Sequence, residues 1–356
     1  MALTADFKEN NLDLLRLIFA GIVVLFHSSA LTAIPGLAPL GEYCNPHFAV
    51  RGFFVISGLL IYRSYTRSSS IRSYLEKRAR RIYPAYFTII VVAAIVLPFI
   101  SPDFPHHTYG PAFWKYLAAN LLFLNFMAPN LPGVFTANSM QAVNGALWTL
   151  KIEVVFYLLV PPIHSLCKRH GTKLTIGTIF GLSILWKCTF WLLAILDPSR
   201  PIWDKLDVQI PSQMTYFCAG ILLLAYMDKL KDKVLIVSAI AACAFVADHF
   251  WGREVLDVVW ISGFVLVCGF LRYAGNFTKY GDFSYGVYIV HWPILQCMIF
   301  FDLTRLNPLI FLLLALALVF AASFLMWHLV EKRFLAASSH YRHAPVEVRN
   351  PIKVLV

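Results

Sequence analysis

Charged side chains are scarce in this chain. They make up 14% of its 356 residues, whereas 59% of the residues are hydrophobic and the mean hydropathy is +0.68. Soluble globular domains carry about 25% charged residues, because their surfaces face water. The shortage excludes a soluble enzyme or a soluble binding module. The sequence therefore predicts an all-α fold, a polytopic integral membrane bundle.

Metal-binding patterns and internal repeats are also missing from the sequence. The seven cysteines are scattered, mostly inside apolar runs, with no CxxC pair and no other metal-ligand spacing, so we expect no metal. No internal repeat is visible, which weakens the case for a transporter built from inverted repeats. The formal net charge of +11 comes mostly from loops expected on one side of a membrane, so it predicts topology rather than nucleic-acid binding.

Apolar segments long enough to cross or enter a bilayer recur along the chain. Positive charge indicates which of them cross, because Lys and Arg concentrate in cytoplasmic loops. The basic loops 63–83 and 167–173 can both lie inside only if 113–128 does not cross. We predict about ten transmembrane helices plus one re-entrant or interfacial segment, 113–128. The apolar segments fall near 12–31, 48–64, 84–101, 113–128, 147–166, 174–195, 212–227, 233–248, 255–272, 284–302 and 307–330.

We expect one transmembrane domain over residues 1–335, followed by a cytoplasmic tail over residues 336–356. Both termini are cytoplasmic in this topology. The first apolar helix contains Asp13 and Arg16, where a signal peptide would be purely apolar, so we expect it to be retained.

Two ionisable residues, Arg16 and His27, interrupt the first apolar run. They are eleven positions apart, and eleven helical steps of about 100° bring both side chains to one face, roughly 16 Å apart along the axis. An intramembrane Arg is costly unless it pairs or reaches water, so this face should line a protein interior or a hydrated cavity. Taken separately, Arg16 could snorkel to the surface and His27 could be a hydrogen-bonded core histidine.

Two further segments each allow two interpretations. In RGFFVISGLLIY, Ser57 and Gly58 lie mid-helix and favour close helix packing, and Arg51 near the outer end could snorkel. In LEKRARRIYPAYF, Arg78 and Arg81 precede a proline at the start of a helix. They are either a positive-inside anchor or a cytoplasmic phosphate clamp, because guanidinium groups match phosphate oxygens in pairs.

The segment ALWTLKIEVVFYLLVPP places a carboxylate in an apolar run. Glu153 has Lys151 two positions before it and Tyr157 one turn after it. Such a carboxylate must be paired, protonated or facing an interior. It is either a catalytic group or half of an ion pair with Arg16 or Arg51.

A second intramembrane histidine, His291, lies in GDFSYGVYIVHWPIL. It shares a polar stripe with Ser284 and Tyr288. It could be a second base, a ligand contact or a hydrogen-bonded core histidine.

Taken together, the motifs resemble the acyltransferase-3 family. They are Arg-x10-His in the first helix, FFVISG in the second, RARRIYPAYF before the third, LWTLKIEVVFYLLVP in the fifth and GDFSYGVYIVHWP in the tenth, and they run in order from about residue 8 to 334. The resemblance implies a ten-helix membrane enzyme. Such enzymes move an acyl group, usually acetyl from acetyl-CoA, onto a hydroxyl of a surface or lipid-linked glycan, which here implies the bacterial cytoplasmic (inner) membrane.

The resemblance also implies catalytic roles. His27 would be the catalytic histidine and Arg16 its partner in the same helix. Glu153 matches the acidic residue that follows the LW motif. Residues expected to contact the acceptor substrate are Arg51, Trp148, Lys151, Tyr157 and His291, of which Arg51 and Lys151 depart from the family's usual residues.

The donor side is implied in the same way. Arg78 and Arg81 match the family's cytoplasmic Arg-x-x-Arg, thought to hold coenzyme A phosphates, and Ser57 and Gly58 match its Ser-Gly pair. Acetyl-CoA, or another acyl-CoA, would be the donor substrate, with no metal. The expected partners are membrane lipid and a glycan acceptor, not nucleic acid.

Two other functions fit the same sequence. A transporter or flippase for a lipid-linked glycan could use the polar stripe as its pathway, but it would need no cytoplasmic arginine clamp. An acyl-sensing or structural membrane protein is the second alternative.

Overall fold

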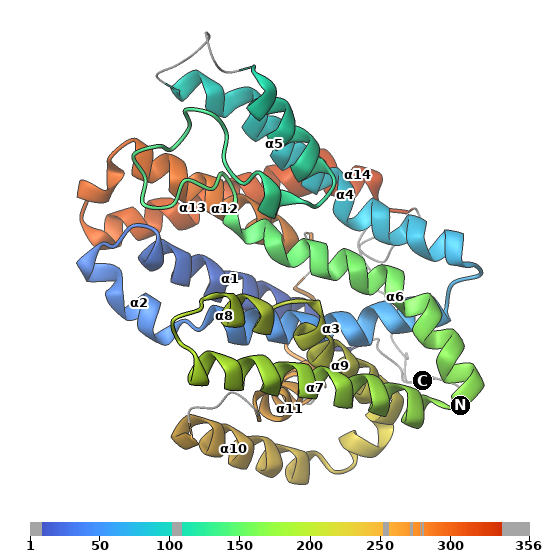
Figure 1. The fold of residues 1–356 in the computed structure, drawn as a ribbon. Helices are drawn as coiled ribbons and strands as arrows, with labels where there is room; N and C mark the ends of the chain where they lie inside the picture. Colours follow the sequence, from blue (N-terminus) through green and yellow to red (C-terminus); the bar gives the residue numbers. More distant parts are fainter. Residues whose placement is uncertain are drawn as a thin grey trace, which may run out of the picture.

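Helices make up most of the chain that the structure describes. The computed structural model describes residues 9–101, 109–251, 256–270, 273–277, 279 and 281–336. Those ranges contain helices, turns and loops, and no strand (Figure 1). Of the predicted tail, 336–356, all but the first residue lies outside the described residues.

Most of the longer helices coincide with apolar segments of the sequence, although α4 begins well before its segment. The longer ones end where polar loops, glycine or basic residues follow the apolar runs. They are α1 Leu12–Ala30, α2 Ala38–Tyr43, α3 Pro46–Thr66, α4 Ile71–Val96, α5 Pro111–Leu121, α6 Trp148–His170, α7 Thr172–Leu196, α8 Ile202–Asp207, α9 Ile210–Lys231, α10 Val234–Trp251, α11 Asp257–Phe270, α12 Ser284–Phe300, α13 Pro308–Met326, a π-helical turn Trp327–Glu331 and α14 Lys332–Phe334.

Several of these helices are long and apolar enough to cross a membrane. Six candidate spans meet this condition among the described residues, and a seventh if the bent pair α2 and α3 forms one span. Two shorter apolar helices, α10 and α11, lie beside them in the chain. The all-α membrane bundle is therefore confirmed, while the number of about ten crossings stays a prediction.

Segment 113–128 forms a short helix and a turn instead of a full-length span. Helix α5 has 11 residues and is followed by a 3₁₀ turn, Asn125–Met127. Eleven residues rise about 16 Å, roughly half of the 30 Å hydrocarbon thickness. A helix of this length cannot cross by itself, but its re-entrant or interfacial placement stays a prediction.

The basic segment 63–83 is mostly helix and not a loop. Helix α3 continues to Thr66 and α4 begins at Ile71, where the hydroxyl of Ser70 accepts a hydrogen bond from the first turn at 3.1 Å. Pro84, expected at the start of a helix, lies in the interior of α4. Arg78 and Arg81 therefore lie on one rigid helix, which fixes where their side chains can reach.

Helices α3 and α9 cross unusually closely, and Gly58 is one reason. A Cβ atom on Gly58 would lie 2.0 Å from the backbone oxygen of Phe217, and one on Gly220 would lie 2.0 Å from that of Val55. Only glycine permits this approach, because a backbone carbonyl cannot rotate away. The packing interpretation of Gly58 is therefore confirmed. Helix α1 packs against both α3 and α12 (Figure 1).

Candidate functional site

Two histidines from distant parts of the sequence meet between α1 and α12. Nδ1 of His27 lies 3.0 Å from Nε2 of His291, and the two rings are nearly parallel, at 16°, with centroids 5.1 Å apart. His291 is fully buried, whereas His27 is partly exposed. His27 is thus the accessible member of the pair, and His291 stands behind it.

Arg16 and His27 do share one face of α1. Arg16 contacts Asp282, immediately before α12, and His27 contacts His291 within α12. The interior orientation of this face is therefore confirmed. A hydrated cavity along it stays a prediction.

Trp292 packs against His27 and is held in place by the loop that precedes α6. The indole of Trp292 lies edge-on to His27, with ring centroids 4.8 Å apart, and its Nε1 donates to the carbonyl of Ala142 at 3.0 Å. The side-chain amide of Gln296 donates to the same carbonyl at 2.8 Å. A Cβ atom on Gly145 would lie 2.4 Å from the indole of Trp292. The loop can therefore pack this closely against the indole only with glycine at position 145.

A buried cluster of four charges connects the first turns of α1, the middle of α4, the loop before α12 and the turn after α13. Arg16 binds Oδ2 of Asp282 at 2.8 Å. Arg81 binds the same oxygen through Nη2, and its Nη1 binds Glu331 at 2.8 Å. Burial alone would raise the pKa of Asp282, but the two guanidinium groups and hydrogen bonds from Ser284 hold it well below its usual range. Asp282 is therefore ionised at neutral pH.

Arg78, three residues before Arg81, has different surroundings. Its Nη2 donates to Ser64 at 3.2 Å, and its guanidinium lies over the ring of Tyr157, 5.9 Å from the centroid. The Tyr157 hydroxyl in turn donates to Glu153 at 2.7 Å. Among the described residues no carboxylate pairs with Arg78, and its buried Nε has no hydrogen-bond partner there. Arg78 is thus a cation with spare hydrogen-bonding capacity among the described residues.

Arg51 lies away from these groups. It is buried, and it forms an ion pair at 2.7 Å with Asp257, which also binds Lys187 at 2.9 Å. Arg51 therefore does not snorkel. Lys151 lies over the ring of Phe126, 4.6 Å from its centroid.

Ser57, Trp148 and Glu153 are the remaining residues expected at the site. Ser57 and Trp148 are half-buried on α3 and at the start of α6. Glu153 accepts a hydrogen bond from Tyr157. The expected ion pair of Glu153 with Arg16 or Arg51 is not the one observed, because Arg16 binds Asp282 and Arg51 binds Asp257. The catalytic role of Glu153 stays a prediction.

Three acidic residues escaped the sequence reasoning: Asp257, Asp282 and Glu331. Each begins or ends an apolar segment, where an acidic residue is ordinary, so no local signal marked it. The available hint was that each intramembrane Arg requires a partner, which is most often a carboxylate elsewhere in the chain. The described residues contain no group of three or more His, Cys, Asp and Glu side chains arranged to hold a metal.

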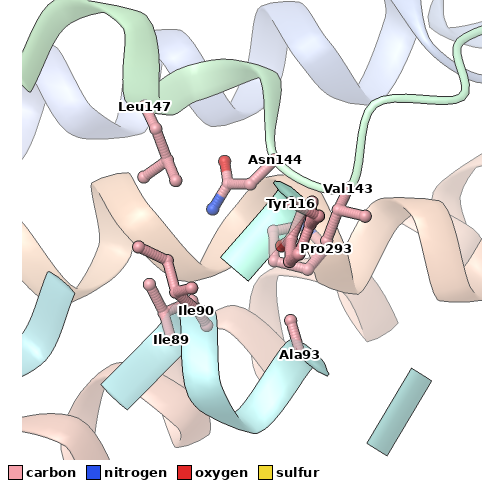
Figure 2. Close-up of a pocket in the computed structure, with 8 residues that line it drawn as sticks. All are labelled: Ile89, Ile90, Ala93, Tyr116, Val143, Asn144, Leu147 and Pro293. Atoms are coloured by element: carbon pink, nitrogen blue, oxygen red, sulfur yellow. The ribbon is translucent and has the colours of Figure 1, made fainter. Parts of the chain in front are cut away.

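A small pocket lies on the opposite side of α12 from His27. It lies between α4, α5, α12 and the loop before α6 (Figure 2). Pro293 is two positions, or about 200°, beyond His291 on the helix, so the pocket opens away from the histidine pair. It does not belong to the site. Its lining is Ile89, Ile90, Ala93, Tyr116, Val143, Asn144, Leu147 and Pro293.

The fold and these polar groups define a helical membrane protein with an ionisable interior. The chain belongs to the acyltransferase-3 family, whose model, described as an acyltransferase domain, matches residues 9–328. With its apolar helices, the protein is thus a multi-pass membrane acyltransferase.

Relatives with curated names include two acetyltransferases. The O-acetyl transferase of Shigella phage Sf6 is 28% identical over 93% of this chain and 98% of that protein. Nodulation protein 10 of Rhizobium leguminosarum bv. viciae is 25% identical over 82% of this chain and 84% of that protein. The peptidoglycan O-acetyltransferase OatA of Listeria monocytogenes is 23% identical over 80% of this chain and 49% of that protein. No solved structure matches the chain.

Proposed function

We propose that this protein transfers an acyl group, most simply acetyl, from cytoplasmic acyl-CoA to a hydroxyl of a surface or lipid-linked glycan at the bacterial inner membrane. One observation carries the proposal. His27 is partly exposed, and its ring contacts the buried His291 of α12. The acetyltransferase names of two relatives support the acyl group and the oxygen acceptor.

The base in this proposal is a ring nitrogen of His27. A neutral imidazole, with an ordinary pKa of about 6.5, can accept the proton of a sugar hydroxyl at neutral pH. The oxygen attacks the thioester carbonyl, the carbon–sulfur bond breaks, and the imidazolium returns the proton to the leaving thiolate. Glu153 is the proposed orienting carboxylate, and the proposed contacts with the acceptor are Arg51, Lys151, Trp148 and Tyr157. His291 is fully buried behind His27, so it is not among them.

Arg78 is the proposed first contact for the donor phosphates. It has no carboxylate partner among the described residues, whereas Arg81 already binds two carboxylates. A phosphate would gain charge-assisted hydrogen bonds from Arg78 without displacing an anion. Arg81 could join only by giving up part of its ion pairs. Ser57 and Gly58 remain proposed as donor-side contacts, although Gly58 also serves the helix crossing.

Donor, acceptor and reaction are tested together by label transfer. Protein in proteoliposomes would be given acetyl-CoA labelled in the acetyl group and a lipid-linked glycan extract from a strain that lacks the gene. We expect label in the glycan fraction and release of free coenzyme A in equal amounts. Movement of glycan across the bilayer without label would contradict the proposal and favour a flippase.

A further inference from the structure

The hydrogen-bond partners of His291 fix which of its nitrogens carries the proton. Its Nδ1 lies 3.3 Å from the carbonyl oxygen of Val287, and the carbonyl of Tyr288 is a second backbone partner of the same side chain. Carbonyl oxygens only accept, so Nδ1 must be the protonated nitrogen. Because the side chain is fully buried, its neutral form is favoured, and Nε2 is left with a lone pair.

That lone pair faces His27, and it determines the tautomer of His27 in turn. The contact between Nε2 of His291 and Nδ1 of His27 is 3.0 Å, a hydrogen-bond distance. Since Nε2 of His291 can only accept, Nδ1 of His27 must donate. The carbonyl of Val23, one turn earlier on α1, is the other partner of His27.

We propose that His291 is a positioning residue that holds His27 in its Nδ1–H tautomer, so that Nε2 of His27 is the base. The inference rests on the proposed function, because it assigns the reacting nitrogen of the same histidine. A neutral imidazole has one proton for two nitrogens, so a hydrogen bond that holds it at Nδ1 leaves the other nitrogen able to take a proton.

The packing of the pair suits this role. The two rings lie nearly parallel, at 16°, and Trp292 flanks His27 edge-on, so rotation of the His27 ring would break the hydrogen bond and meet the indole. Trp292 is itself held by the carbonyl of Ala142. The orientation of the base is thus set by side chains that do not themselves exchange protons with the substrate.

The proton is conserved through the reaction. Nε2 of His27 takes the hydroxyl proton and the ring becomes an imidazolium with both nitrogens protonated. The Nδ1 proton stays in the bond to His291, which accepts it in both states. Nε2 then passes its proton to the leaving thiolate, and the original tautomer is restored.

Nitrogen NMR tests the tautomer in the intact protein. Protein labelled with ¹⁵N at histidine, in lipid bilayers at neutral pH, gives distinct shifts for protonated and unprotonated ring nitrogens. Spectra of His27→Ala and His291→Gln assign the two rings, and His249→Gln, on the exposed end of α10, is the control that should leave both unchanged. We expect Nδ1–H with bare Nε2 on His27. The Nε2–H form on His27 in the wild-type protein overturns the proposal.

Kinetics of two substitutions give the second test. In His291→Gln the amide oxygen can occupy the place of Nε2 and still accept from His27, whereas in His291→Asn the shorter amide cannot reach. We expect kcat to fall about 10²-fold in His291→Asn and to recover most of that loss in His291→Gln, with KM for acetyl-CoA unchanged in both. Equal kcat values for the two variants would contradict the positioning role. If His27→Ala itself retained transfer, the proposed function would fail instead, whatever the tautomer.

Discussion

At the residue scale, Arg78 and Arg81 have different surroundings although both lie in the same basic stretch of α4. Arg81 neutralises two buried carboxylates, and Arg78 rests on a tyrosine ring with part of its guanidinium unsatisfied. One sequence motif therefore contains a structural cation and a cation free to bind an anion. The two roles can be separated experimentally.

We expect Arg78→Ala to weaken binding of acyl-CoA by roughly 10- to 100-fold, the value of a charge-assisted hydrogen bond, with little change in thermal stability. Titration calorimetry in detergent measures the affinity. Arg80→Ala is the matched control, because Arg80 pairs with Glu76 at the surface. An unchanged Kd for Arg78→Ala beside a weakened one for the control would contradict the assignment.

Arg81→Ala should act on stability first. It leaves Asp282 and Glu331 short of a buried partner, and breaking a buried ion pair costs about 3–5 kcal/mol. Thermal unfolding followed by tryptophan fluorescence should show a clearly lower Tm than for Arg78→Ala. Equal Tm values for the two variants would mean that the buried cluster contributes little.

The stability contributed by Asp282 should not depend on pH in the physiological range. Its folded-state pKa is lowered by Arg16 and Arg81, so the stabilisation is present above the unfolded value of about 3.9 and lost only as the pH falls toward the folded value. We expect Asp282→Asn to lower Tm by the same amount at pH 5 and pH 8. A deficit that disappears at pH 5 would show that the carboxylate is already protonated there.

At the element scale, the α3–α9 crossing depends on Gly58 and Gly220, whose absent side chains let the two backbones touch. Gly58 also lies in the FFVISG motif, so the helix packing and the proposed donor contact fall on one residue. A substitution that adds a Cβ atom tests the packing.

We expect Gly58→Ala to destabilise the protein by about 1–3 kcal/mol, because the new methyl would overlap the Phe217 carbonyl and the helices must move apart. Gly181→Ala on α7, where no atom lies within 4 Å of the added carbon, is the control. A Tm for Gly58→Ala equal to that of Gly181→Ala would contradict the close crossing.

Helix positions and the shared face of Arg16 and His27 could be predicted because they depend on local periodicity. The partners of those residues could not. Arg16 and Asp282 are 266 positions apart and His27 and His291 are 264 apart, and nothing local in the chain encodes such pairings. The basic stretch 63–83 was misjudged as a loop because its charges obscured a helix that continues into the apolar part of α4.

At the scale of the whole molecule, the buried charge cluster lies toward the end of the bundle where α1 and α12 start and α13 ends, and Arg81 joins it from the middle of α4. The predicted topology makes this the cytoplasmic end, which is where acyl-CoA is found. The histidine pair lies deeper along the same helices. A donor that enters beside Arg78 would then extend its thioester inward toward His27. The depth of His27 below the charge cluster is set by the roughly 16 Å that separate Arg16 from His27 along α1.

The topology is tested by accessibility of single cysteines in a cysteine-free background. Ser139, in the loop before α6, and Arg333, in α14, are both exposed. We expect an impermeant thiol reagent added to intact cells to label Ser139→Cys and not Arg333→Cys. Labelling of both from outside would contradict cytoplasmic placement of the end of α13.

The measurement that tests the central claim most directly is acyl transfer by His27→Ala in the proteoliposome assay, with acyl-CoA affinity measured on the same preparation. A general base contributes typically 10²- to 10⁴-fold in rate. We therefore expect transfer to fall by about that factor while the Kd for acyl-CoA stays the same. Wild-type turnover in His27→Ala would contradict the account, and its loss in His291→Ala alone would move the base to α12.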